Sequence, residues 1–258
     1  MIIALIFTLG TILGSFLNVC IHRLPKGQSV VLPGSHCPGC KKPIEWYDNI
    51  PLLSYILLRG KCRVCGWRIP ARYFIVELFT ALLLTALYLV FGITVQFFAY
   101  GVMTALLLIA TFVDFEIQEI PDEVSLGGIA AGVVLSTIFP VLMEVRGPWH
   151  GLIFSIMGAF AGGASIYAMG FIGELIFKKE AMGGGDVKLM AMIGSFLGWK
   201  LVLLTFFIAP IFGAGVGIIK KLKDGSQTIA YGPYLSMAAL VALLWGERII
   251  ALFAYGLY

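Results

Sequence analysis

The sequence predicts an all-α polytopic membrane protein with about eight transmembrane helices and a small zinc-binding cytosolic loop domain between helices 1 and 2. Three observations lead to this fold class. Of the 258 residues, 60% are hydrophobic and 12% are charged, whereas soluble domains average about 45–50% and about 25%. The apolar residues form near-continuous blocks, most of them close to the roughly 20 residues with which a helix crosses a bilayer. Four of the five cysteines stand as two pairs in a long polar segment.

The apolar blocks define the expected membrane spans. We expect helices, because a chain in hydrocarbon must satisfy its backbone hydrogen bonds within itself and the alternating pattern of a barrel strand is absent. The opening block lacks the basic start of a signal peptide, so we interpret it as a retained first helix. The block 187–199 is short, which indicates a partial or tilted span. The expected spans are 2–21, 73–91, 95–113, 124–143, 151–177, 187–199, 201–219 and 233–254.

The distribution of Lys and Arg predicts the orientation, because short cytosolic loops are enriched in these residues. With the amino terminus outside, only Arg146, Lys200 and Arg248 fall on the outer side, which leaves fifteen of the 18 basic residues on the cytosolic side. The formal net charge of +4 is therefore a topology signal, and we expect membrane lipid rather than nucleic acid as a partner. The expected division is a first transmembrane helix (1–22), a cytosolic zinc-binding loop domain (23–72) and a transmembrane core (73–258).

Two Cys-x-x-Cys pairs, Cys37 with Cys40 and Cys62 with Cys65, predict a metal site. Each pair places two thiolates on one face of a tight turn, and two such turns complete a tetrahedral Zn²⁺ site. Four thiolates leave the ion no open position, so we expect the site to be structural. The alternative is a pair of disulfides, which a reducing cytosol disfavours. Cys20, the fifth cysteine, ends the first span and is expected to pack rather than to bind metal.

Carboxylates at the edges of spans are candidate functional residues, because a charge is costly at membrane depth. Asp186 follows three glycines at the start of a span, and its alternative role is that of a helix N-cap. Asp114 ends its span, where the helix dipole disfavours an anion, so its alternative is a solvated residue at the interface. Glu77, just inside the second span, is expected to snorkel at the membrane edge, and its alternative role is to orient part of the cytosolic loop. In the expected topology both aspartates lie near the cytosolic face, and two close carboxylates can supply the acid and the base for attack of water on an amide.

Segments spread along most of the chain resemble those of the type IV prepilin peptidases, which are membrane aspartic proteases of the GxGD class. The cysteine quartet is similar to the zinc-binding cytosolic loop of that family. His22 departs from the aromatic residue expected at its position, which casts no doubt on the chemistry. The other matching segments are the amino-terminal signature GSFLNV with HRLP (14–19 and 22–25), the first catalytic segment (114–122), the GxGD segment GGGDVKL (183–189) and the carboxyl-terminal YGPY (231–234).

The resemblance implies a bifunctional enzyme. It implies that Asp114 and Asp186, in an aspartic protease core at 73–258, cleave the leader peptide of type IV prepilins or pseudopilins at the cytosolic membrane face. It also implies N-methylation of the new amino-terminal residue, with S-adenosylmethionine as methyl donor and Zn²⁺ as a structural cofactor. The expected location is a bacterial inner (cytoplasmic) membrane, with the amino terminus outside. The methyl-donor site, the choice between type IV pilus and type II secretion, and the oligomeric state stay open.

Three alternatives predict different features. A cation or proton transporter needs carboxylates deep in its spans, whereas both aspartates here stand at span ends. An assembly scaffold with degenerate catalytic residues would lack an aspartate, and both are present. A prepilin peptidase without methyltransferase activity is the narrower alternative, and the intact cysteine loop favours the bifunctional enzyme over it.

Overall fold

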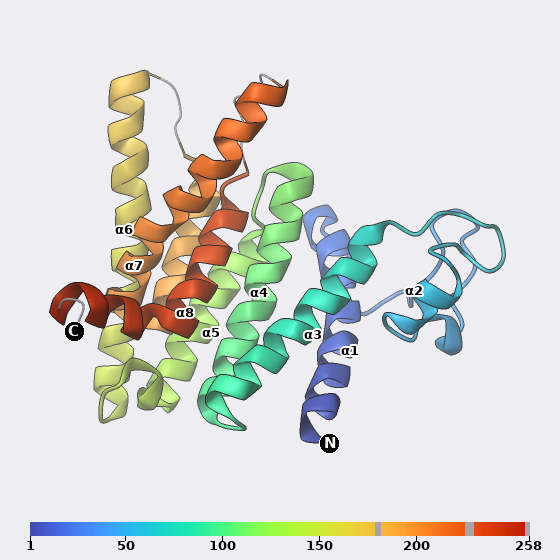
Figure 1. The fold of residues 1–258 in the computed structure, drawn as a ribbon, viewed down its shortest axis with the longest axis horizontal. Helices are drawn as coiled ribbons and strands as arrows, with labels where there is room; N and C mark the ends of the chain where they lie inside the picture. Colours follow the sequence, from blue (N-terminus) through green and yellow to red (C-terminus); the bar gives the residue numbers. More distant parts are fainter. Residues whose placement is uncertain (179–181, 225–229, 256–258) are drawn as a thin grey trace. The chain divides into compact units, whose positions relative to one another are not determined.

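The computed structural model describes residues 1–178, 182–224 and 230–255. Within these ranges the chain forms helices joined by loops, with two isolated β-bridges and no β-strand. The all-α class is therefore confirmed. The chain separates into two compact units, Met1–Ile93 and Thr94–Tyr258 (Figure 1). Lys179, one of the basic residues expected on the cytosolic side, lies outside the described residues.

Two long helices form the apolar part of the first unit, and they pack against each other. An added Cβ on Gly14 of the first helix would lie 2.6 Å from Cα of Glu77 on the second. Asn18, one turn further along, donates a hydrogen bond of 3.0 Å to the carbonyl of Tyr73. Small residues at such crossings let two backbones approach closely in a membrane. The helices are α1 (Ile2–Arg23) and α3 (Ala71–Phe91).

Because α3 packs on α1, the compact units divide after Ile93, one helix later than the expected boundary after residue 72. The loop between these helices holds only short elements and is tied to the end of α1 by Arg23. This side chain is 8% exposed and donates to the carbonyls of Ser29 at 2.9 Å and Pro33 at 2.6 Å. A buried guanidinium needs such partners. The elements are η1 (Leu24–Lys26), η2 (Trp46–Asp48) and α2 (Leu53–Leu57).

The second unit is a helical bundle built around the start of α7. Ser136 of α5 and Ser155 of α6 both donate to the carbonyl oxygen of Ser195, at 3.2 and 2.7 Å, so α7 lies between these two helices. Side chains of α7 on either side of this point, among them Met192 and Phe196, are fully buried. The elements are α4 (Val95–Ile117), α5 (Asp122–Ile138), η3 (Pro140–Met143), α6 (Pro148–Phe177), α7 (Gly184–Asp224) and α8 (Gly232–Tyr255).

A reversal at Gly198 divides α7 into two arms. Gly198 has φ 73° and ψ 175°, a backbone conformation that glycine adopts without steric cost. Met190 and Val202 both lie beside Gly162 of α6, whereas a straight helix would hold them about 18 Å apart. The chain therefore doubles back at Gly198. The two expected spans 187–199 and 201–219 are the arms of this helical hairpin, and the first is short because the turn ends it.

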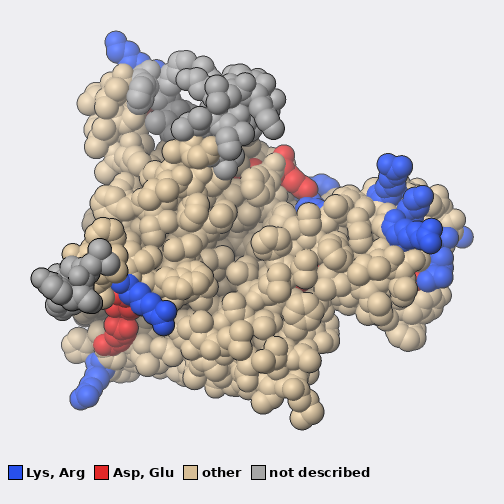
Figure 2. All heavy atoms as spheres, viewed as in Figure 1, with Lys and Arg blue, Asp and Glu red and all other residues tan. Residues whose placement is uncertain are grey.

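Six helices among the described residues are long and apolar enough to cross a membrane, namely α1, α3, α4, α6, α7 and α8. Helix α5 has 17 residues and ends at Ile138, before the expected end of its span at residue 143. Since α7 contains two arms, each of the eight expected spans contains a helix. Large apolar side chains on their flanks are exposed, for example Phe160 at 76% and Phe253 at 83%. Figure 2 shows broad uncharged areas over the helices. Such exposed apolar helix surfaces are suited to contact with the hydrocarbon of a bilayer, so the chain is a membrane protein.

Candidate functional site

Asp114 lies in the last turn of α4 and is 5% exposed. The carboxyl end of its own helix is unfavourable for an anion. However, its Oδ2 accepts a hydrogen bond of 2.9 Å from the backbone N–H of Gly232, the first residue of α8. Asp114 therefore satisfies the start of another helix, whose dipole favours a carboxylate. The residue is buried in a bundle rather than solvated at its edge.

Asp186 is the third residue of α7. Its backbone N–H donates to the carbonyl of Gly183 at 3.1 Å, and its carboxylate accepts a hydrogen bond from the backbone of the same residue. A side chain that reaches back from the third helical position is the second half of a capping box, so Asp186 is not itself the N-cap. An added Cβ on Gly184 would meet nothing within 4 Å. Gly184, two residues before Asp186, thus borders open space.

Tertiary packing brings the two aspartates together. Asp114 and Asp186 are close enough for the charge of the first to act on the second. Ile120, in the connection between α4 and α5, lies beside Gly185, which precedes Asp186, and beside Gly232, which binds Asp114. An added Cβ on either glycine would lie 3.3 Å from Ile120. The site is assembled from the end of α4 and the starts of α7 and α8. Two carboxylates in such a place can share the proton needed for acid and base catalysis.

Tyr231 and Lys188 flank this pair of carboxylates. Burial, followed by the negative charge of Asp186, raises the pKa of Tyr231 to about 12, so the phenol keeps its proton at neutral pH and can donate a hydrogen bond. The Nζ of Lys188 pairs with Oδ1 of Asp122 at 2.6 Å, and both side chains are partly exposed. This ion pair links the starts of α7 and α5, and it is worth at most about 1 kcal/mol.

The two Cys-x-x-Cys turns have the same backbone geometry. The N–H of Cys37 donates to the carbonyl of Lys42 at 2.9 Å, and the N–H of Cys62 donates to that of Trp67 at 2.8 Å. In both turns the residue after the second cysteine has a positive φ, 61° in the first and 71° in the second. The equivalent turns direct their thiols to one point, and all four sulfurs lie within 4.8 Å of one another.

The arrangement of these sulfurs fits one metal ion. Sγ of Cys37 and Sγ of Cys65 lie 3.7 Å apart, and a tetrahedral zinc ion with Zn–S bonds of about 2.3 Å separates its ligand sulfurs by about 3.8 Å. Backbone N–H groups of Cys65 and then of Val64 lower the pKa of Cys62 to about 7. Cys62 therefore gives up its proton more readily than an ordinary thiol. In contrast, the pKa of Cys65 is raised to about 11, because a backbone hydrogen bond from Trp67, which favours ionisation, is outweighed by burial and the neighbouring thiols, which oppose it. A bound metal ion needs both thiols deprotonated. A quartet that can hold a metal is what the spacing predicts.

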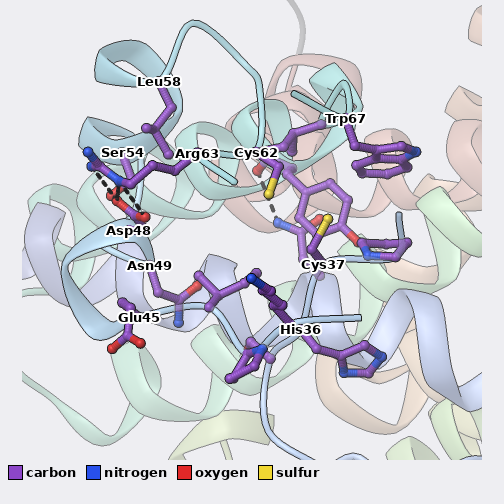
Figure 3. Close-up of a pocket in the computed structure, with 18 of the residues that line it drawn as sticks. His36, Cys37, Glu45, Asp48, Asn49, Ser54, Leu58, Cys62, Arg63 and Trp67 are labelled. Carbon is purple, nitrogen blue, oxygen red and sulfur yellow. Dashed lines mark hydrogen bonds and ion pairs between the residues drawn. The ribbon is translucent and has the colours of Figure 1, made fainter. Parts of the chain in front are cut away.

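The loop carries anchors that sequence reasoning missed. Arg63 forms a bidentate ion pair with Asp48, in which Nη2 donates to Oδ1 at 2.6 Å and Nε to Oδ2 at 2.8 Å. Hydrogen bonding from Arg63 lowers the pKa of the Asp48 carboxyl. Figure 3 shows this pair beside Cys62 and Cys37, whose sulfurs face the same space. Nothing in the spacing identifies the pair, because its members are fifteen positions apart in an irregular loop.

Glu77 takes the second of its expected roles and orients the loop. It lies near the start of α3, is 8% exposed, and accepts a hydrogen bond of 2.7 Å from the backbone N–H of Leu52 through Oε2. Leu52 has φ 60°, a conformation that is unusual for a residue with a side chain. The carboxylate therefore holds a strained turn of the loop against α3.

Comparisons with known proteins identify the family. The model of the bacterial peptidase A24 N-terminal domain matches residues 8–91, and that of the type IV leader peptidase family matches residues 101–218. A protein of Aeromonas hydrophila is 34% identical over 95% of this chain and 91% of its own length. The chain belongs to the type IV leader peptidase family. This confirms the resemblance seen in the motifs.

Other members of the type IV leader peptidase family extend the likeness. A protein of Pseudomonas aeruginosa is 35% identical over 93% of the chain and 89% of its own length. One of Myxococcus xanthus is 40% identical over 85% of the chain, which spans only 63% of that longer relative. All three relatives are named prepilin leader peptidase/N-methyltransferase. No solved structure matches the chain.

Proposed function

We propose that the chain cleaves the leader peptide of type IV prepilins or pseudopilins and then N-methylates the new amino-terminal residue. The names of its relatives support both activities. The observation that supports the proposal is the proximity of Asp114 and Asp186, which is close enough for the charge of one to act on the other. Residues 72 positions apart lie near each other at the ends of α4 and α7, and the backbone N–H of Gly232 holds the first of them in place.

The proposed cleavage uses one water molecule and one proton shared by the two carboxyls. The ionised carboxylate takes a proton from water while the water oxygen bonds to the carbonyl carbon of the scissile amide, and the protonated carboxyl donates to the carbonyl oxygen. The tetrahedral intermediate then collapses. As its C–N bond breaks, one hydroxyl of the intermediate returns its proton to the carboxylate that had donated one, and the leaving nitrogen receives a proton from the carboxyl that took it from water. No covalent enzyme intermediate forms.

The proposed methyl transfer belongs to the first unit, with S-adenosylmethionine as the source of the methyl group. Zn²⁺ bound by Cys37, Cys40, Cys62 and Cys65 would hold the loop in shape, since four thiolates leave the ion no open position. The loop has few buried apolar residues of its own. Metal binding would therefore supply folding free energy that the loop lacks.

We place the protein in a bacterial inner membrane, with the amino terminus outside and the loop and active site on the cytosolic side. The count of basic residues supports this orientation. A transporter is not favoured, because its ion ligands would lie near the middle of the spans. Here Asp114 stands in the last turn of α4 and Asp186 in the first turn of α7.

The test is a reaction with a synthetic prepilin segment, in which a basic leader precedes an apolar helix. The purified protein in liposomes is incubated with this substrate, with and without S-adenosylmethionine, and the products are weighed by mass spectrometry. The expected result is leader release in both reactions and one added methyl group only when the donor is present. An intact substrate after incubation overturns the proposal. Cleavage without methylation reduces it to a peptidase.

A further inference from the structure

The first unit contains a cavity of about 560 Å³ between the loop and the ends of α1 and α3 (Figure 3). This volume lies within the range of about 300–1,000 Å³ that small-molecule sites occupy. Residues of the loop form most of its wall, and they include three of the four cysteines of the metal site and the basic side chains of Lys41, Lys42 and Arg63. The helices contribute Asn18 and Glu77, among others. The two catalytic aspartates belong to the other unit, so peptide cleavage gives this cavity no role.

Glu77 presents a buried carboxylate to this cavity. Only neutral groups stabilise it: Leu52 donates a backbone N–H at 2.7 Å, and the hydroxyl of Ser15 also donates to it. Among the residues that the structure describes, no Lys, Arg or His forms an ion pair with it. A carboxylate removed from water without a cation is costly. The site is therefore suited to a cationic ligand.

Asn18 adds a second acceptor on the facing helix. Its side chain is buried, with the residue 1% exposed, and its Nδ2 donates to the carbonyls of Tyr73 and Gly14 at 3.0 and 3.3 Å. These two carbonyls fix the orientation of the amide. Oδ1 has no hydrogen-bond partner in the described part of the chain. Both residues line the same cavity, and a bound group with several N–H donors would satisfy both acceptors.

We propose that Glu77 and Asn18 bind a protonated primary amine in this cavity. The inference rests on the proposed methyltransferase activity, which offers two such amines: the new amino terminus of the cleaved substrate, and the amino group of the methyl donor. An ammonium group supplies both the positive charge and the N–H donors that the two side chains lack.

Methyl transfer to the new amino terminus also needs a proton acceptor. The α-ammonium first loses a proton to the Glu77 carboxylate, because only the neutral amine has a lone pair. The nitrogen then bonds to the methyl carbon of the sulfonium donor, and the C–S bond breaks with its electron pair left on sulfur. The product is a methylated ammonium and a neutral thioether, and the proton on Glu77 passes to water.

The decisive experiment compares full-length wild type with Glu77→Gln. Glutamine keeps the shape of the side chain and still accepts from Leu52, so the loop remains anchored. Glu144→Gln, at an exposed carboxylate of the second unit, is the matched control. Binding of a cleaved-substrate peptide is measured with its amino terminus free or acetylated, together with binding of S-adenosylhomocysteine. Leader cleavage is assayed alongside.

For Glu77→Gln we expect cleavage close to wild type and a loss of at least about tenfold in binding of one amine, the loss that follows removal of one charged hydrogen bond. If Glu77→Gln no longer binds the peptide with a free amino terminus more tightly than the acetylated peptide, the bound amine is the substrate's. If S-adenosylhomocysteine binds more weakly instead, the amine is the donor's. Glu77→Asp should restore part of whichever affinity is lost.

Unchanged binding of both ligands to Glu77→Gln would overturn the amine site, and so would a parallel loss of cleavage, zinc content and binding. A failure of the proposed function looks different. In that case the wild type does not methylate its substrate. The amine site is still tested by binding: it exists if the wild type prefers a free over an acetylated amino terminus and Glu77→Gln loses that preference.

Discussion

At the scale of single residues, Asp114 holds a buried carboxylate at the unfavourable end of its own helix. The start of α8 compensates, because Gly232 donates its backbone N–H to the carboxylate at 2.9 Å. The approach leaves no room for a side chain, since a Cβ on Gly232 would lie 2.8 Å from Oδ2 of Asp114. Glycine at this position is therefore required by the contact.

Replacing Gly232 with alanine is expected to displace the Asp114 carboxylate and to lower kcat for leader cleavage by about 10²-fold, the loss that follows a misplacement of about 1 Å at a reacting group. Gly127→Ala on α5 is the control, because a Cβ there meets nothing within 4 Å. The two variants are compared in liposomes at equal protein concentration. Equal activity would contradict the role given to the Gly232 contact.

The cysteine quartet predicts one zinc ion per chain. Cys40→Ser is expected to abolish zinc binding and to make the loop sensitive to protease, because structural zinc contributes about 10–16 kcal/mol to the folding of small metal-bound units. Cys20→Ser should retain the metal, since Cys20 is buried on α1 outside the quartet. Elemental analysis of the purified proteins measures both. Zinc retained by Cys40→Ser would exclude the quartet as its site.

At the scale of elements, small residues set how closely the helices pack. On α1, Gly14 lies against the backbone of α3. Between α6 and α7, Gly158 and Gly194 each leave space that the other's carbonyl oxygen fills. Membrane helices have little hydrophobic drive to associate, so close van der Waals packing carries much of their association. The positions of Glu77 and Asn18 depend on the first of these contacts.

Gly14→Ala is therefore expected to destabilise the first unit by about 1–3 kcal/mol, the usual cost of overpacking a tight contact. Thermal unfolding in detergent measures the effect. The comparison is again Gly127→Ala, which should be neutral or slightly stabilising because alanine favours a helix more than glycine does. If Gly14→Ala melted like Gly127→Ala, α1 and α3 would not pack as described.

At the scale of the whole molecule, the exposed apolar surface needs a hydrocarbon surrounding, whereas the charged loops need water. A bilayer with its two aqueous faces provides both. Exposed apolar side chains cover the flanks of the helices, while most basic residues stand in the loops expected on one side. Hydrocarbon suits the apolar side chains on the helix flanks, and short loops on the cytosolic side are enriched in basic residues. The proposed orientation, with the amino terminus outside, rests on this division.

The orientation predicts the accessibility of two equally exposed positions. Val31 in the loop is 76% exposed and Trp149 at the start of α6 is 75% exposed. A membrane-impermeant maleimide should label Trp149→Cys in intact cells, and Val31→Cys only after the cells are permeabilised. Wild type, with its native cysteines, gives the background. Labelling of Val31→Cys from outside would reverse the orientation.

Local pattern accounts for much of this structure. Bilayer thickness sets span length, so apolar blocks predict the helices, and two cysteines three positions apart make their turn without help from distant residues. Contacts between distant segments escape such reasoning. The bond from Gly232 to Asp114 spans 118 positions, and that from Leu52 to Glu77 spans 25. For this reason the sequence leaves open the alternative that Asp114 is a solvated residue at the interface. In the structure, another helix buries and stabilises it.

The central claim is that two aspartates act as one catalytic pair, and isosteric variants test it most directly. Leader cleavage in liposomes is measured for wild type, Asp114→Asn, Asp186→Asn and the control Asp122→Asn, whose exposed carboxylate pairs with Lys188. We predict that each of the first two variants loses at least about 10²-fold in rate, while Asp122→Asn cleaves like wild type. Substantial cleavage by Asp114→Asn or by Asp186→Asn would contradict the catalytic pair.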